Sequence, residues 1–159
     1  MQDDVLKTIK NAKPAFERIT NIKQGFLTNA NKYATCSRIQ SSLQIFGDDL
    51  AVDCFGHFAT AKPRPVRIST GDYFMEYVFT VPFGNQRIEV TRFYLSECGQ
   101  VLDDPTTQDA ICSFDNHLIA THLCARVLLG FLESPLLAPA QAQHCDLNVD
   151  ATASVTVSG

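Results

Sequence analysis

The sequence predicts a single α+β domain, in which an antiparallel meander of about five or six strands is flanked by N-terminal helices and a long apolar C-terminal helix. Three observations predict this fold. Apolar residues recur every three or four positions at the N-terminus, alternate with polar residues through the middle, and cover most of a helical circumference over residues 105–132. We assign residues 1–134 to this domain and residues 135–159, which hold no Lys or Arg, to a mobile tail.

Composition restricts the class of protein. A chain of 159 residues that is 45% hydrophobic and 19% charged can bury a core without covalent cross-links. It has no apolar run near the ~20 residues of a membrane-spanning helix, and its acidic first residues do not resemble a secretion signal. We therefore expect a cytoplasmic protein, away from membranes, whose six cysteines are reduced.

The N-terminal region reads as helix because its apolar residues fall on one stripe: Val5, Ile9, Ala12, Phe16, Ile19, Phe26 and Ala30. Pro14 lacks an N–H, so we expect two helical pieces and not one rod. Residues 1–38 carry seven Lys/Arg against three Asp/Glu, whereas the rest of the chain has a net charge of −8. This basic end could dock on an acidic partner, but without an aromatic platform or a recognised motif it does not favour nucleic acid.

The period changes near residue 38. Residues 37–46 fit either a strand or a short helix, and the turn residues Gly47-Asp48-Asp49 then lead into a hairpin over residues 50–58. Two prolines in residues 62–65 restrict that stretch to a connector or a sheet edge.

The clearest local pattern is the hairpin at Gly84-Asn85, a two-residue turn with Gly at its first central position. The register this turn implies pairs Val81 with Ile88 and Tyr77 with Arg92. One face of the hairpin is then apolar almost throughout. The other is polar near the turn and apolar far from it, and it needs cover from a helix or a second subunit. We predict a protein interface there, formed by Phe74, Val78, Phe93 and Leu95.

Arg92 is unusual in that register because it lies among aromatic residues. A guanidinium there can stack on rings or bind a carboxylate or phosphate. The predicted ligand site, suited to a small anionic amphiphile, consists of Met75, Tyr77, Phe79, Arg92 and Tyr94. The alternative is an Arg at the strand end, paired with an acid or reaching solvent.

Asp104-Pro105 predicts the start of the C-terminal helix over residues 105–132, which a break near Ser113 would shorten. A helix this apolar must be buried on more than one side, against the sheet and against the N-terminal helices or a second copy.

No motif indicates catalysis, a metal or a cofactor. Cys54 and His57 have zinc-like spacing, but positions three apart on a strand face opposite ways, and no second pair follows. His122 and Asp115 share a helix face, but no nucleophile lies beside them. We therefore predict no catalytic residues, no metal site and no cofactor.

The first functional hypothesis is a small cytoplasmic binding or protein-interaction module without catalytic activity. It is expected to be a homodimer, and a narrower version of the hypothesis has it hold a small anionic amphiphile against the aromatic sheet face. Two alternatives remain open. One is a small enzyme that uses His57, His122 or Asp115 for acid–base chemistry in a cleft between sheet and helices. The other is an adaptor whose basic N-terminal helices dock on an acidic partner.

Overall fold

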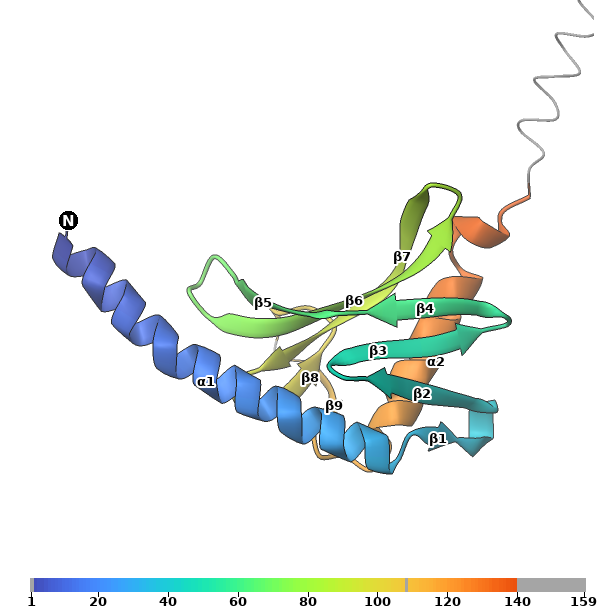
Figure 1. Ribbon diagram of the computed structural model, residues 1–159, viewed down its shortest axis with the longest axis horizontal. Helices are drawn as coiled ribbons and strands as arrows, with labels where there is room; N and C mark the ends of the chain where they lie inside the picture. The colour runs from blue at the N-terminus through green and yellow to red at the C-terminus, as the bar shows by residue number, and fades with distance from the viewer. Residues whose placement is uncertain (1, 108, 140–159) are drawn as a thin grey trace, which may run out of the picture.

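The computed structural model describes residues 2–107 and 109–139 and confirms an α+β fold with an antiparallel sheet (Figure 1). The sheet has nine strands, so the expected five or six is wrong. The strands are β1 Thr35–Cys36, β2 Ser41–Phe46, β3 Asp49–Cys54, β4 His57–Ala61, β5 Pro63–Arg67, β6 Tyr73–Phe83, β7 Gln86–Ser96, β8 Gln100–Leu102 and β9 Ala110–Ser113. The helices are α1 Gln2–Lys32 and α2 Ile119–Leu132, with short 3-10 turns η1 Ser37–Ile39 and η2 Pro135–Leu137.

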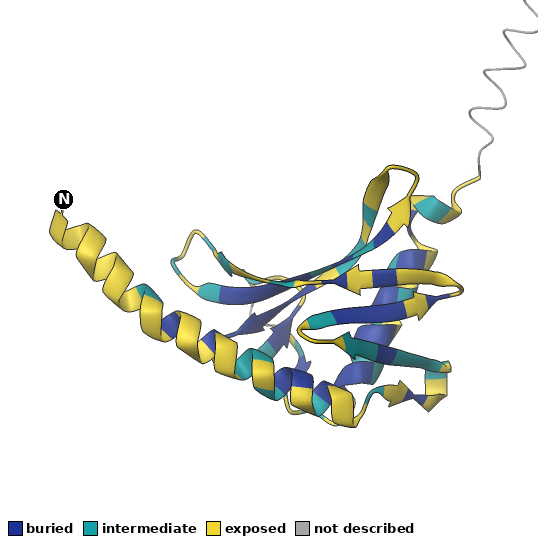
Figure 2. Ribbon diagram, in the orientation of Figure 1, coloured by how far each residue is buried: buried dark blue, intermediate teal, exposed yellow. Residues whose placement is uncertain are grey.

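Both helices pack against one face of the curled sheet and share a single core with it (Figures 1 and 2). At its centre the rings of Tyr77 and Phe93 stack 4.9 Å apart, and Phe26 of α1 lies within 6 Å of both. Leu123 and Val127 of α2 complete this core. Burial of these large side chains is the main force holding the helices on the sheet.

Helix α1 is continuous from Gln2 to Lys32, so the prediction of two pieces is wrong. Pro14 lies inside the helix on an exposed turn. The one backbone hydrogen bond lost there borders solvent, where water can serve the free carbonyl, and the helix continues on both sides.

The structure can be compared with the predictions for the strands that precede the central hairpin. Residues 37–46 contain both of the predicted alternatives, since η1 precedes strand β2. The Pro-rich stretch is confirmed as a sheet edge, because β5 pairs with β6 alone. Strand β8 follows the turn at Gly99 and pairs with β7.

The turn at Gly84-Asn85 is confirmed, with Gly84 at φ +59°, but the register it implies holds only near the turn. Thr80 pairs with Glu89 as predicted, whereas Phe79 pairs with Thr91. Val90 is therefore an extra residue, a β-bulge, and every residue of β7 beyond it faces the opposite way from the prediction. Tyr77 lies opposite Phe93, and Arg92 lies opposite Val78.

The C-terminal helix is shorter than predicted and begins at Ile119. Asp104, expected to cap a helix, instead accepts hydrogen bonds from the backbone N–H and hydroxyl of Thr106 in a local turn. Residues 110–113 then pair with β8. Helical periodicity assigns these four residues to the C-terminal helix, but they form the edge strand β9 instead. Of the predicted tail, Pro135–Leu137 forms η2, and residues 140–159 lie outside the described part of the chain.

The bulge also brings α2 close to the sheet. A Cβ built on Gly130 would lie 2.1 Å from the carbonyl oxygen of Val90. That contact is with backbone, which a side-chain rotation cannot relieve. Glycine at this position therefore lets the helix pass directly over the bulged strand.

Replacing Gly130 with Ala should therefore destabilise the protein by about 1–3 kcal/mol, the usual effect of overpacking. Helix propensity alone predicts the opposite, a gain of about 1 kcal/mol. Urea denaturation measures the free energy of unfolding of the variant and of the wild type. Ala125→Gly, at an exposed position of the same helix, is the control for helix propensity. A more stable Gly130→Ala variant would contradict the close approach of α2 to Val90.

Candidate functional site

The structure divides the predicted ligand site between the two faces of the sheet. Met75, Tyr77 and Phe79 are buried in the core under the helices. Arg92 and Tyr94 are on the outer face, which the helices do not cover. The cause is the bulge at Val90, which turns these two side chains outward and brings Phe93 and Leu95 inward. The five residues therefore do not come together as an aromatic pocket around Arg92.

Arg92 instead belongs to a network of charges on the outer face. Its guanidinium pairs with Glu89 on the same strand and lies 3.6 Å from the carboxylate of Glu76, whose other oxygen accepts from Arg64 at 2.8 Å. The hydrogen bond from Arg92 lowers the pKa of Glu89, and in turn Glu89 and then Tyr94 raise the pKa of Arg92. The cation is thus neutralised within the chain, which removes the main reason to expect an anionic ligand there.

The predicted interface residues are divided in the same way. Phe93 and Leu95 are buried in the main core, whereas Phe74 and Val78 face outward. Phe74 is itself covered, because it packs with Tyr94 and Leu102 in a small second cluster flanked by Val66 and Ile68. The chain's own strands and loops thus supply much of the cover that we had expected from a second subunit.

The candidate catalytic and metal-binding side chains lie apart. Cys54 and His57 face each other across the β3–β4 turn, not on one strand as assumed, but Cys54 is fully buried and His57 lies against the ring of Phe131. Asp115 accepts a hydrogen bond from Ser113. Within residues 2–107 and 109–139 no hydrogen bond joins His57, His122 or Asp115, and no three His, Cys, Asp or Glu side chains could hold a metal.

An exposed apolar surface lies on the N-terminal half of α1. We call residues 2–14 the projecting segment. All of them are exposed except Ala12, and Val5, Leu6 and Ile9 are 54%, 55% and 60% accessible (Figure 2). Val5 and Ile9 belong to the same stripe that further along the helix is buried at Ile19 and Phe26. The stripe therefore runs past the end of the sheet into solvent.

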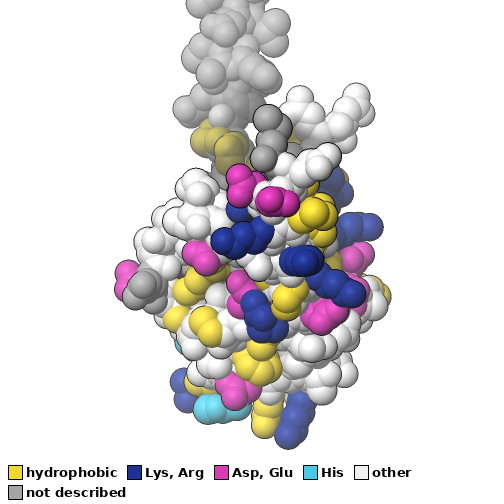
Figure 3. Space-filling view, turned by 90° about the vertical axis from the view of Figure 1, so that its left-hand side faces the viewer, with side chains coloured by type: hydrophobic (Ala, Val, Ile, Leu, Met, Phe, Trp, Pro, Cys, Tyr) yellow, Lys and Arg dark blue, Asp and Glu magenta, His cyan; other side chains and the backbone are white. Residues whose placement is uncertain are grey.

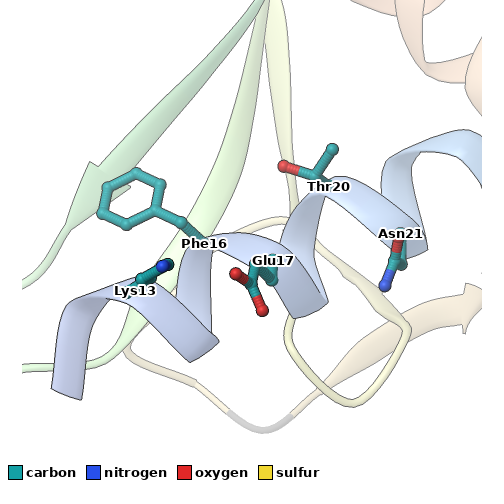
Figure 4. A pocket seen from close by; sticks show the side chains of 5 residues that line it. All are labelled: Lys13, Phe16, Glu17, Thr20 and Asn21. Carbon is teal, nitrogen blue, oxygen red and sulfur yellow. The ribbon is translucent and has the colours of Figure 1, made fainter. Parts of the chain in front are cut away.

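The last contact between the stripe and the sheet is made by Phe16, whose ring lies 5.2 Å from that of Tyr73. A shallow hollow of about 440 Å³ lies at this point, lined by Lys13, Phe16, Glu17, Thr20 and Asn21. Figure 4 shows that all five side chains come from α1, so the hollow has no opposite wall among the described residues. It is shaped to receive part of another surface and not to enclose a small molecule.

A second concave feature adjoins the place where α1 leaves the sheet. We call it the end cleft; its volume is about 600 Å³, and loops 68–72, 96–100 and 105–107 surround it. Phe74 and Leu102 give it apolar walls and Asp72 and Glu97 give it carboxylates, and none of the described residues that line it is a Lys or an Arg. Figure 3 looks onto this end of the molecule, where apolar side chains are interspersed with charges of both signs.

Arg18 of α1 borders the end cleft. It donates two hydrogen bonds to Glu97, at 2.6 and 3.0 Å, so the cleft lies directly beside the helix. Asp72, which also lines the cleft, accepts from the Thr70 hydroxyl through its carboxylate and from the Ile68 N–H through its carbonyl oxygen. Of the two carboxylates in the cleft, Glu97 is therefore paired with a cation of α1.

Sequence analysis missed the end cleft because its lining comes from three loops distant in sequence. The projecting segment had a signal, the unbroken stripe from Val5 to Phe16, but periodicity does not tell which half of a helix is buried.

Comparison with protein-family models, curated proteins and solved structures gives no match to this chain. Among the described helices, none combines the length and apolar character needed to cross a membrane.

The described cysteines give a pH prediction. Burial raises the pKa of the Cys54 and Cys112 thiols to about 11 and that of Cys124 to about 12, from an ordinary value of 9.0. The native state thus favours the protonated thiols, and this contribution to stability is complete below pH 9 and lost as the pH rises towards 11–12. Urea denaturation at pH 8 and pH 10.5 should show the loss, and the Cys54→Ala/Cys124→Ala variant should lose less. An equal loss in both proteins would contradict the raised thiol pKa values.

Proposed function

We propose that this protein is a non-catalytic protein-interaction module and that the projecting segment of α1 is its docking element. The observation that carries the proposal is the exposure of Val5, Leu6 and Ile9 on a stretch of helix that has no neighbour among residues 2–107 and 109–139. Exposed apolar residues scattered singly need no explanation. Here three lie within one and a half turns, on a stripe that continues into the core.

Energetics supports the same conclusion. An isolated helix of 13 residues is marginal in water, and apolar side chains left in water contribute nothing to folding. Covering them with a partner would release about 25 cal/mol for each Å² of apolar surface removed from water. An amphipathic helix that binds a groove through residues at i, i+3, i+4 and i+7 is a common recognition mode, and Val5 and Ile9 have the i, i+4 spacing.

A second candidate, the adaptor for an acidic partner, is favoured by Lys7, Lys10 and Lys13. These three lysines are exposed beside the apolar stripe of the projecting segment. The two candidates differ in what they depend on: apolar contact should survive high salt, whereas attraction between exposed charges is screened within about 3 Å at 1 M ionic strength.

The enzyme and the carrier of an anionic amphiphile remain proposals without geometric support, since their predicted residues do not converge. A cytoplasmic location also remains a proposal. The free state of Cys36, Cys54, Cys98, Cys112 and Cys124 supports it.

The test is a comparison of baits. Wild-type protein, Ile9→Glu and the control Phe83→Glu are immobilised and exposed to an extract of cells that produce the protein. Phe83 is 55% exposed in the β6–β7 turn, so the control introduces the same charge at a similarly exposed apolar position. We expect a protein retained by wild type and by Phe83→Glu to be lost from Ile9→Glu, because a carboxylate in an apolar contact is strongly unfavourable.

The retained protein is then purified, and its dissociation constant is measured by calorimetry with each of the three forms. The Ile9→Glu variant should keep the wild-type free energy of unfolding to within about 0.5 kcal/mol, as surface substitutions do. Equal affinity of all three forms would reject the projecting segment as the docking element.

A further inference from the structure

We propose that the partner of the projecting segment is a second copy of this chain and that the segment docks in the end cleft of that copy. This inference rests on the proposed function and adds the identity of the partner. In the resulting dimer each chain inserts its own segment and receives the other, so the same contact occurs twice about a two-fold axis.

Chemical complementarity is the first reason. The projecting segment presents apolar Val5, Leu6 and Ile9 beside three lysines, which outnumber its two acids, Asp3 and Asp4. The end cleft presents the reverse arrangement. Among the described residues its lining holds the carboxylates of Asp72 and Glu97, the latter paired with Arg18, and the small exposed parts of Phe74 and Leu102, which are 7% and 5% accessible. A basic amphipathic helix is the kind of ligand that such a cleft fits, because its stripe meets the apolar walls while its lysines face the acids.

Rigidity is the second reason. The segment cannot reach the end cleft of its own chain, although the cleft lies beside α1 at Arg18. Helix α1 passes through Pro14 without a break, and its position is fixed by Phe16 against Tyr73 and by Ile19 in the core. Ile9 is seven residues before Phe16, about 10 Å further along a straight helix axis. The two complementary surfaces can therefore meet only between molecules.

Sedimentation velocity on the purified full chain at concentrations from 1 to 200 µM in 0.15 M NaCl tests the inference. We expect a concentration-dependent dimer. Ile9→Glu, which alters the segment, and Asp72→Lys, which alters the cleft, should each raise the dissociation constant at least tenfold. Phe83→Glu should leave the constant unchanged. Circular dichroism and thermal denaturation of each variant show whether it is folded.

Charge exchange gives the sharper test. Lys10→Glu/Lys13→Glu places an acidic segment against an acidic cleft, and Asp72→Lys places a basic segment against a basic cleft, so each variant alone should be monomeric. In an equimolar mixture both contacts of a heterodimer join opposite charges, and the dimer should return. The exposed Thr107→Lys in the cleft lining replaces Asp72→Lys if the latter disturbs its loop.

Three results would overturn the inference: wild-type protein that is monomeric at 200 µM, a dimer unaffected by Ile9→Glu and Asp72→Lys, or a mixture that stays monomeric. A monomer combined with loss of a different protein from the Ile9→Glu bait would leave the proposed docking element intact and assign it to another partner. A dimer insensitive to every variant, together with equal retention on all baits, would reject both.

Discussion

The extra residue at Val90 is the constraint on which the rest of the structure depends. It lets one strand present Val90 to the core at the bulge and Phe93 and Leu95 beyond it. An unbroken register would instead have placed Arg92 opposite Tyr77, and an Arg without a buried carboxylate partner could not remain there. Strict alternation along β7 would bury the charge of Arg92. The bulge avoids this and leaves Arg92 on the outer face with Glu89 and Glu76.

The aromatic centre that the bulge creates also determines the course of α1. Phe26 packs against Tyr77 and Phe93, and Asn29 donates hydrogen bonds to the carbonyls of Phe114 and Asn116 at 3.0 and 2.9 Å. These contacts hold the C-terminal half of the helix on the sheet. A helix rises about 1.5 Å per residue, so a continuous chain of 31 residues extends well past this anchor. The projecting segment is thus a consequence of where the core fixes the helix.

The parts of the fold that the sequence predicts correctly are those that local chemistry decides. The turn at Gly84-Asn85 and the edge strand at Pro63 depend on the backbone conformations that Gly and Pro permit. The wrong predictions concern segments whose structure depends on contacts with residues distant in sequence. Asp104-Pro105 is a good helix start, yet β8 was available to pair with residues 110–113. The bulge at Val90 depends on the polarity of Arg92 and on a close approach by Gly130, and neither is visible in strand alternation. The predicted ligand site failed with that register, because its residues were assembled by alternation alone.

The same reasoning explains why an exposed helix can serve as a docking element. Nucleating a helix is unfavourable, but adding a residue to an existing one is close to neutral or favourable for good helix formers. The buried turns around Phe26 and Ile19 supply the nucleus, so the projecting segment, with Lys7, Lys10 and Lys13 among its residues, can remain helical without a neighbour. Binding through an already ordered helix costs less conformational entropy than binding through a flexible segment that must first fold. The anchored half of α1 thereby prepares the free half for association, which links the packing of the core to the proposed function at the opposite end of the helix.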